Sequence, residues 1–328
     1  QSKFDYGIFA EEQIKFFNGT TIDSYNSGPD GHHRDYGEDL GGGIKNIFEN
    51  GHIGSNGMMS SGNEAAILLM NYQSASGEVI KGKVSTGPGG NIYGPGLNTD
   101  DIDNLIKGDK DDISHNNDVD LLPEPVPDLI WNSQTEKLDI DRDKKKISTG
   151  NYKYSSINMR SGGKLIIDGD VKIYLTKADE DSLKVEGRDF SEPDPDNQSS
   201  EIIINPKSSL TIYTNGGVIV RNHGNINNLT RDPKKLTIYS AFSPTSEHNI
   251  EGIDIVNRSD FYGAIYAPGA HISIMNNGNI FGSFVGNDIS VTNRTKLHYD
   301  ESLAGKITDS TVVWCEISDA FSRDCSSF

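Results

Sequence analysis

Carboxylates occur at every second position from Asp139 to Asp143, with Asp141 between them. Alternate residues of a β-strand lie on one face, so these three side chains could together offer oxygen ligands to a calcium ion. The segment does not follow the loop of an EF-hand, because Lys144 stands where that loop requires glycine. The lysines at this point also offer charge compensation without a metal, so we interpret the carboxylates as solvated charge, with calcium binding as the alternative. A second acidic stretch, Asp109–Asp120, leaves the same choice, and no other cofactor is expected.

A histidine pair is the second group that could hold a metal. His32 and His33 are adjacent, and Asp30 and Asp35 lie on either side of them. Imidazole and carboxylate groups bind transition metals, but adjacent side chains of an extended chain point in opposite directions. We therefore expect a polar loop here rather than a metal centre.

The acidic segment Asn98–Asp101 resembles part of the acid cluster of polygalacturonases, which are parallel β-helical enzymes. Cleavage of a glycosidic bond needs carboxylates that converge from neighbouring rungs, and a uronate substrate needs a basic residue as well. The downstream pair His223-Gly224 lacks a preceding glycine and a suitably spaced basic partner. We interpret the segment as a solvated acidic loop and expect no enzymatic activity, with a β-helical carbohydrate-active enzyme as the alternative.

Charge and hydropathy limit the function classes further. The chain has 328 residues and a net charge of −18, which opposes binding to nucleic acids and to anionic lipid. It contains no run of 18 apolar residues that would predict a transmembrane helix. It begins with Gln1 rather than methionine, so we expect that a preceding segment has been removed.

A degenerate repeat near the C-terminal end predicts the fold that must position these groups. The segment Phe261–Ile265 returns as Ile280–Phe284, and His271–Ile274 returns as Asp288–Val291. Each copy holds two short strands of alternating apolar residues and a polar turn, and it cannot bury its apolar side alone. Stacked copies bury that side continuously, so the sequence predicts an all-β protein, a right-handed parallel β-helix. The residues expected to point inward are Phe261, Ile265, Ile272, Ile274, Phe281, Phe284, Ile289 and Val291.

The turns of this repeat carry asparagine. Asn257, Asn276 and Asn293 occupy equivalent positions, and asparagine tolerates left-handed backbone geometry while its amides can stack from rung to rung. We interpret the three as a turn ladder, with glycosylation as the alternative. The sequons of the chain begin at Asn18, Asn197, Asn228, Asn257 and Asn293.

Composition along the chain gives the boundaries. Prolines at positions 123, 125 and 127 predict an extended linker, and the alternation expected of a solenoid stops near Tyr299. The predicted parts are an N-terminal connecting segment (1–43), early irregular rungs with an acidic loop (44–122), a proline-rich linker (123–130), the main solenoid (131–300), and a C-terminal cap (301–328).

The cysteines of the chain are Cys315 and Cys325, both close to its end. A disulfide between them would close a short loop and contribute roughly 3 kcal/mol in the loop-entropy model. Free thiols in a reducing compartment are the alternative. We also expect Thr311–Trp314 to form a strand that caps the last rung or joins a small sheet with N-terminal residues.

Three segments carry a family resemblance: GNYKYSSINMRSGGKLIIDGDVKIYL, DFYGAIYAPGAHISIMNNGNIFGSFVGNDISV and LHYDESLAG. Together they resemble the β-solenoid-bearing type IV pilin-like proteins of the PilX minor-pilin type, over about residues 8–305. The resemblance implies a structural and binding protein at the cell surface or on a pilus, a minor or tip pilin in assembly, adhesion or uptake. Its partners would be other pilin subunits and surface or host ligands, and its membrane contact only the N-terminal helix of the family, which these residues lack. The resemblance also implies that residues 1–43 are a pilin-like segment and that residues 301–328 hold a pilin-like strand, with the cysteine pair similar to the disulfide loop that closes pilin heads. A secreted β-helical adhesin is the alternative.

Overall fold

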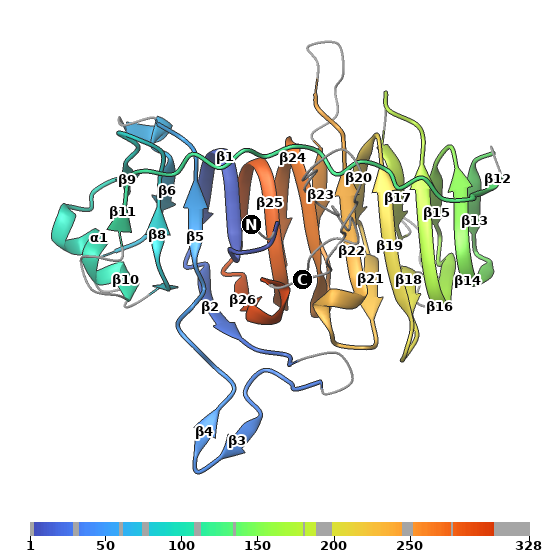
Figure 1. The fold of residues 1–328 in the computed structure, drawn as a ribbon, viewed down its shortest axis with the longest axis horizontal. Coiled ribbons are helices and arrows are strands. Elements are labelled where there is room, and N and C mark those ends of the chain that lie inside the picture. The colour runs from blue at the N-terminus through green and yellow to red at the C-terminus, as the bar shows by residue number, and fades with distance from the viewer. Residues whose placement is uncertain are drawn as a thin grey trace, which may run out of the picture.

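The structure is a computed structural model, and it consists of a long parallel β-solenoid (Figure 1). It describes residues 3–28, 33–58, 62–73, 79–107, 113–133, 136–179, 181–187, 199–244, 252–276 and 278–304. Strand pairing defines three parallel faces around one apolar core, here called faces A, B and C. The predicted fold class, an all-β parallel β-helix, is therefore confirmed.

Each face is a ladder of parallel strands in register. Face A stacks β13 (Leu138–Asp141), β15 (Ile157–Arg160), β17 (Asp181–Glu186), β20 (Gly217–Arg221), β23 (Ile253–Ile255), the last parts of β24 (Phe261–Met275), β25 (Asn279–Thr292) and β1 (Ile8–Phe17), then β6 (Ile67–Met70) and β9 (Ile92–Tyr93). Face B stacks the first parts of β14 (Lys144–Tyr154) and β16 (Lys164–Leu175), β18 (Ser200–Ile204), β21 (Gly224–Asn228), the first parts of β24 and β25, β26 (Lys296–Asp300), β2 (Thr21–Tyr25), β7 (Ile80–Lys81) and β10 (Ile106–Lys107). Face C stacks β12 (Asn132–Ser133), the last parts of β14 and β16, β19 (Ser209–Thr214), β22 (Leu236–Ser240), the middles of β24 and β25, the start of β1, β5 (Ile53–Ser55), β8 (Val84–Ser85) and β11 (Ile113–Ser114).

Smaller elements lie outside the three faces of the solenoid. A hairpin of β3 (Asp39–Gly41) and β4 (Ile44–Lys45) projects from it, and α1 (Thr99–Leu105) lies at one end (Figure 1). Single turns of 3-10 helix occur at Gly62–Glu64, Pro233–Lys235 and Glu301–Leu303.

Alternation of apolar residues explains why these segments form rungs. In β16, every second side chain from Leu165 to Ile167 and from Val171 to Leu175 is buried, and the residues between them are partly exposed. That period of two places one apolar row inside each face. The repeat found in the sequence gives the observed register, because Phe261 pairs with Ile280 and Ile265 with Phe284.

One expected core residue lies elsewhere. Seven of the eight predicted inward residues belong to the core, but Phe281 points outward from face B. Its neighbour Ile280 fills the inward position, and strand alternation then turns Phe281 to the outside. It is still only 4% exposed, because Tyr25 and Tyr36 pack against its ring.

The path of the chain differs from the predicted order. The chain begins in the middle of the solenoid, where β1 pairs with β25 on one side and with β5 and β6 on the other. It builds rungs toward α1, crosses the length of face C as an extended segment, and returns rung by rung from β12 to β26 (Figure 1). We call the crossing segment, residues 115–131, the strap.

Two expectations are corrected by this path. Residues 1–43 are not only a connecting segment, because β1 and β2 are rungs of the solenoid. The solenoid does not end near Tyr299, because β26 pairs along its length with β2, which covers the edge that we expected Thr311–Trp314 to cover. The physical reason is that the N-terminal strands fill the open edge left by the last rungs, which satisfies the backbone groups of both.

Candidate functional site

Outward-facing tyrosines form a column on face C. The register places Tyr174, Tyr213, Tyr239 and Tyr266 in successive rungs, and we call these four residues the aromatic ladder. The column continues through Val285 to Phe9 of β1. These positions point away from the core, yet Tyr239 is only 6% exposed and Tyr266 only 3%. A second layer of chain must therefore cover them.

That layer is the strap. Its side chains Val119, Leu121, Val126 and Trp131 pack against the buried cluster that contains three tyrosines of the aromatic ladder together with Phe9 and Val285. Tyr266 donates its hydroxyl proton to the carbonyl of Leu122 at 2.9 Å, and Asn56 bonds both backbone groups of Val119, at 2.6 and 3.0 Å. The alternate prolines keep the strap extended and remove backbone donors that would otherwise need partners.

The residues before β1 form a second segment over face C, here called the N-terminal arm (Lys3–Tyr6). Phe4 is buried, and Tyr299 donates a hydrogen bond of 2.7 Å to its carbonyl. Ser283 donates a hydrogen bond of 2.5 Å to the Tyr6 carbonyl. The ammonium group of Lys3 pairs with Glu124 of the strap and lies 4.7 Å from the ring centroid of Tyr266. The arm and the strap are thus joined directly.

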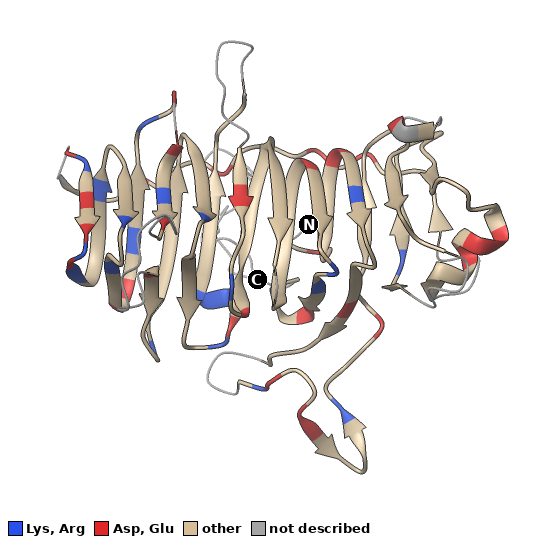
Figure 2. Ribbon diagram, turned by 180° about the vertical axis from the view of Figure 1, so that it is seen from behind, with Lys and Arg blue, Asp and Glu red and all other residues tan. Residues whose placement is uncertain are grey.

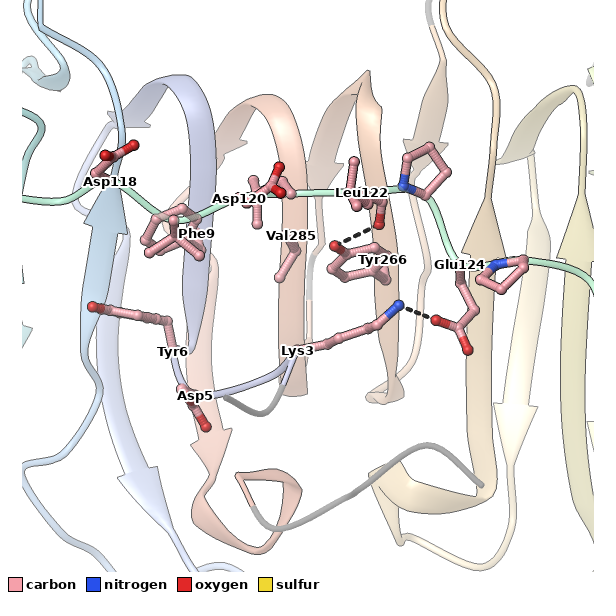
Figure 3. A pocket seen from close by; sticks show the side chains of 14 residues that line it. Lys3, Asp5, Tyr6, Phe9, Asp118, Asp120, Leu122, Glu124, Tyr266 and Val285 are labelled. Carbon is pink, nitrogen blue, oxygen red and sulfur yellow. Dashed lines mark hydrogen bonds and ion pairs between the residues drawn. The ribbon is translucent and has the colours of Figure 1, made fainter. Parts of the chain in front are cut away.

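A cleft of about 600 Å³ lies between the arm and the strap (Figure 3). Its floor is built by Phe9, Val285 and Tyr266, and Tyr6 stands at one side. Four carboxylates line it, against one ammonium group, that of Lys3. The four carboxylates are those of Asp5, Asp118, Asp120 and Glu124. This combination of aromatic surface and negative charge suits a cation better than an anion.

The titration of Tyr266 reports the same negative field. Burial, together with the negative charges of Glu124 and Asp120, raises the pKa of Tyr266 to about 12. A nearby carboxylate opposes formation of a phenolate for the same reason that it attracts a cation. The cleft is therefore the candidate functional site.

The predicted calcium ligands lie on the far end of the solenoid from α1, where acidic and basic residues stand side by side (Figure 2). Asp139 accepts a hydrogen bond of 3.1 Å from Asn158, which holds the pKa of its carboxyl below the usual value, with Lys137 adding to the effect. Asp141 pairs with Arg160 at 3.0 Å. Asp143 accepts a hydrogen bond of 2.7 Å from the backbone of its neighbour. Calcium binding stays a prediction.

Asp141 and its partner Arg160 belong to a longer row of charged residues on face A. Strand register pairs Asp141 with Arg160 and Glu186 with Arg221, and Arg160 and Glu186 each follow the paired residues Met159 and Val185 of neighbouring rungs. We call these four residues the ion ladder. Arg221 pairs with Glu186 at 2.7 Å. Within the ranges that the structure describes, no group of three or more His, Cys, Asp or Glu side chains is arranged to hold a metal ion.

The three asparagines of the predicted turn ladder lie at one corner, between faces A and B. Asn257 and Asn276 are each 1% exposed, and both donate their amide protons to the carbonyl of Ser259, at 3.0 and 3.2 Å. Asn293 is exposed and has a φ of 60°. The expected left-handed geometry thus occurs at Asn293 and not at the other two, which bond backbone groups inside the corner.

The remaining predicted groups are placed as follows. Asn98 and Asp101 form a capping box at the start of α1, so the acidic segment begins a helix rather than a loop. His33 lies 3.1 Å from Asp35. Residues outside the described part of the chain are Asp30, His32, Asp109–Asp112, Asn197, Thr311–Trp314, Cys315 and Cys325.

A buried polar network lies on face B. Tyr36 donates to Asp23 at 2.7 Å, and the two ring nitrogens of His298 lie 2.5 Å from Asp23 and 3.3 Å from Asn279. The ring of Tyr36 covers that of His298, with centroids 3.9 Å apart. Both imidazole nitrogens of His298 therefore have partners within the fold. Through Tyr36, the network attaches the segment between β2 and β5 to the solenoid.

Sequence reasoning missed the cleft, although one signal was present. The tetrapeptide Leu-Thr-Ile-Tyr occurs at residues 210–213 and again at 236–239, and its tyrosines are consecutive members of the aromatic ladder. A tyrosine repeated at an outward position indicates a covered face. The strap that covers it is distant in sequence.

Comparison with known proteins adds a family. Residues 91–306 match the family described as a domain of unknown function, DUF7305. No curated protein matches the chain. An ice-binding protein from an Arctic yeast, solved for the structural basis of its antifreeze activity, is 12% identical over 94% of this chain and 95% of its own. Its TM-score of 0.29 is too low to support any conclusion about this chain. No helix in the described ranges has the length and apolarity to span a membrane.

Proposed function

The chain belongs to the DUF7305 family, and from its geometry we propose that it is a structural and binding protein, a pilin-like subunit displayed on a type IV pilus or a related filament. The observation that carries this proposal is the position of the two described ends. Phe4 at one end and Leu303 at the other are buried in one cluster, together with Tyr299. Both ends are thus fixed at mid-length of the solenoid.

This arrangement suits display. In the proposed subunit, a filament-forming segment precedes the N-terminal arm, and the arm transmits its position to the solenoid through Phe4, Tyr6 and Lys3. The solenoid then lies across that segment and extends to both sides of it. Because β1 is hydrogen-bonded between β25 and β5, force on the arm would be shared between both halves of the solenoid.

Localisation in the organism that carries the gene tests the proposal. An epitope tag at Gly42, in the turn between β3 and β4, leaves the solenoid strands unchanged. We expect the tagged protein in sheared and purified filaments, and we expect immunogold label on those filaments. The matched control carries the same tag behind an ordinary cleavable secretion signal, and it should reach the medium without entering filaments.

The other outcomes separate the alternatives. Tagged protein that is found only in the medium or on the cell surface, with filaments unlabelled, would refute the pilin-like assignment in favour of a free adhesin. Turnover of polyuronates by the purified chain, lost in the Asp100→Asn variant, would refute it in favour of an enzyme.

A further inference from the structure

We propose that the cleft between the N-terminal arm and the strap binds lysine or arginine side chains of an extended polypeptide segment from a partner protein. This inference concerns the cleft alone and does not depend on the filament assignment. It rests on an ammonium group already held there, on the charge of the lining and on the spacing of the carboxylates.

The protein itself shows what the cleft accepts. The ammonium group of Lys3 lies over the ring of Tyr266, 4.7 Å from its centroid, and pairs with Glu124. An aromatic face and a carboxylate together are the usual surroundings of a bound ammonium or guanidinium group. One part of the cleft is thus a cation site occupied by a residue of the same chain.

The rest of the cleft offers the same chemistry. The ring of Tyr6 packs on that of Phe9, with centroids 4.8 Å apart, and presents a second aromatic surface (Figure 3). Asp118 and Asp120 lie across from it on the strap, and both are exposed. Among the described residues, neither Asp118 nor Asp120 makes an ion pair. Their charge is available to a partner.

Charge decides the class of ligand. Four carboxylates and one ammonium group leave the lining with a net charge of −3. An anionic ligand would be repelled by the lining, and a neutral one would gain nothing from its carboxylates. A cationic ligand gains attraction from the carboxylates and from the aromatic rings together.

Spacing favours a polypeptide over a single small amine. Asp118 and Asp120 are alternate residues of an extended segment, so their Cα atoms lie about 7 Å apart. Alternate side chains of an extended partner have the same spacing and would meet the two carboxylates in turn. The volume of about 600 Å³ accommodates two such side chains.

Calorimetric titration at low salt with an acetylated and amidated Lys-Ser-Lys tripeptide tests this proposal. We expect binding by the full chain and none of the matched Glu-Ser-Glu peptide. The double variant Asp118→Asn with Asp120→Asn should bind the lysine peptide about tenfold more weakly. The matched control is Asp100→Asn with Asp103→Asn on α1, which removes the same charge far from the cleft and should bind as the unchanged protein does.

Two further variants separate a built site from general attraction by an acidic protein. Tyr6→Leu keeps the charge and removes an aromatic face, and it should weaken binding about fivefold. Lys3→Gln removes the internal competitor and should tighten binding, whereas Lys145→Gln on β14 makes the same charge change elsewhere and should not. Thermal unfolding of each variant checks that the fold is kept.

Three results would overturn the proposal. Equal weakening by the cleft pair and the α1 pair would reduce the effect to net charge. Unchanged binding by both Tyr6→Leu and Lys3→Gln would remove the cleft as the site. Spermidine binding as tightly as the tripeptide, with the same dependence on Asp118 and Asp120, would assign the cleft to free amines instead of a polypeptide.

Discussion

Faces A and C are built from the same rungs but differ in what lies outside them. On face C, outward positions carry the aromatic ladder, and the strap covers it. On face A, outward positions carry the ion ladder, where the side chain of Arg221 is 45% exposed against 6% for the whole of Tyr239. Strand geometry is the same in both, so the covering segment decides which outward residues stabilise the fold.

The difference has an energetic consequence. A covered aromatic side chain removes a large apolar area from water and contributes stability on the scale of a core residue. An exposed ion pair gains little, because water and salt screen the charges and two long side chains lose freedom. Substitutions on the two faces should therefore differ severalfold in their effect.

The largest difference is expected for Tyr239→Ala. Truncating a buried aromatic side chain costs about 3–5 kcal/mol of unfolding free energy, and the strap also loses a surface to pack on. Arg221→Ala on face A, the matched control, should cost at most about 1 kcal/mol. Urea unfolding measures both. A cost below about 1 kcal/mol for Tyr239→Ala would mean that the strap does not cover the aromatic ladder in solution.

A smaller effect, dependent on pH, is expected at Tyr266. Its pKa is about 12 in the folded chain and about 10 in an unfolded one, so between these values the unfolded chain holds fewer protons. Stability is therefore full below pH 10 and falls as the pH rises toward 12. Tyr266→Phe should cost about 1 kcal/mol at neutral pH through the lost bond to Leu122 and should flatten part of that alkaline decline.

Urea unfolding repeated from neutral to alkaline pH measures this decline. Tyr93→Phe, at a half-exposed position of face A, is the control and should follow the unchanged protein. Burial also raises the pKa of Tyr239 and Tyr299, so part of the decline should remain in Tyr266→Phe. An identical alkaline decline with and without the Tyr266 hydroxyl would contradict the assignment of this titration.

The stacking of rungs could be predicted from sequence because it is nearly local. Phe261 pairs with Ile280 of the next rung, and the alternation of apolar residues that places both in the core can be seen in the sequence. The same logic failed at Phe281, since its neighbour took the inward position and distant aromatic residues covered the outward one. Alternation gives a period of two but does not state which of the two sides is covered.

The pairing of β1 with β25 and the position of the cleft could not be predicted, for a different reason. Ile8 pairs with Phe284, far away in sequence, and any open rung edge of the solenoid offers similar backbone partners. The strap reaches face C from the end of the solenoid that carries α1, so no residue near Tyr239 in the sequence indicates that a segment covers it. Calcium was considered as a ligand of Asp141 because the partner of this carboxylate, Arg160, comes from the next rung and is not evident from the sequence.

The smallest effect is expected in the ion ladder, for the pair of Arg160 and Asp141. Their atoms lie 3.0 Å apart, but the two side chains are 57% and 42% exposed, so the attraction is screened. A double-mutant cycle of Arg160→Gln and Asp141→Asn should give a coupling of about 0.2–1 kcal/mol. The coupling should vanish near 1 M salt, where the screening length falls to about 3 Å, while the cost of Tyr239→Ala persists. A coupling that exceeds about 2 kcal/mol, or that salt leaves unchanged, would show that face A is covered in solution as face C is, and the contrast between the two faces would fail.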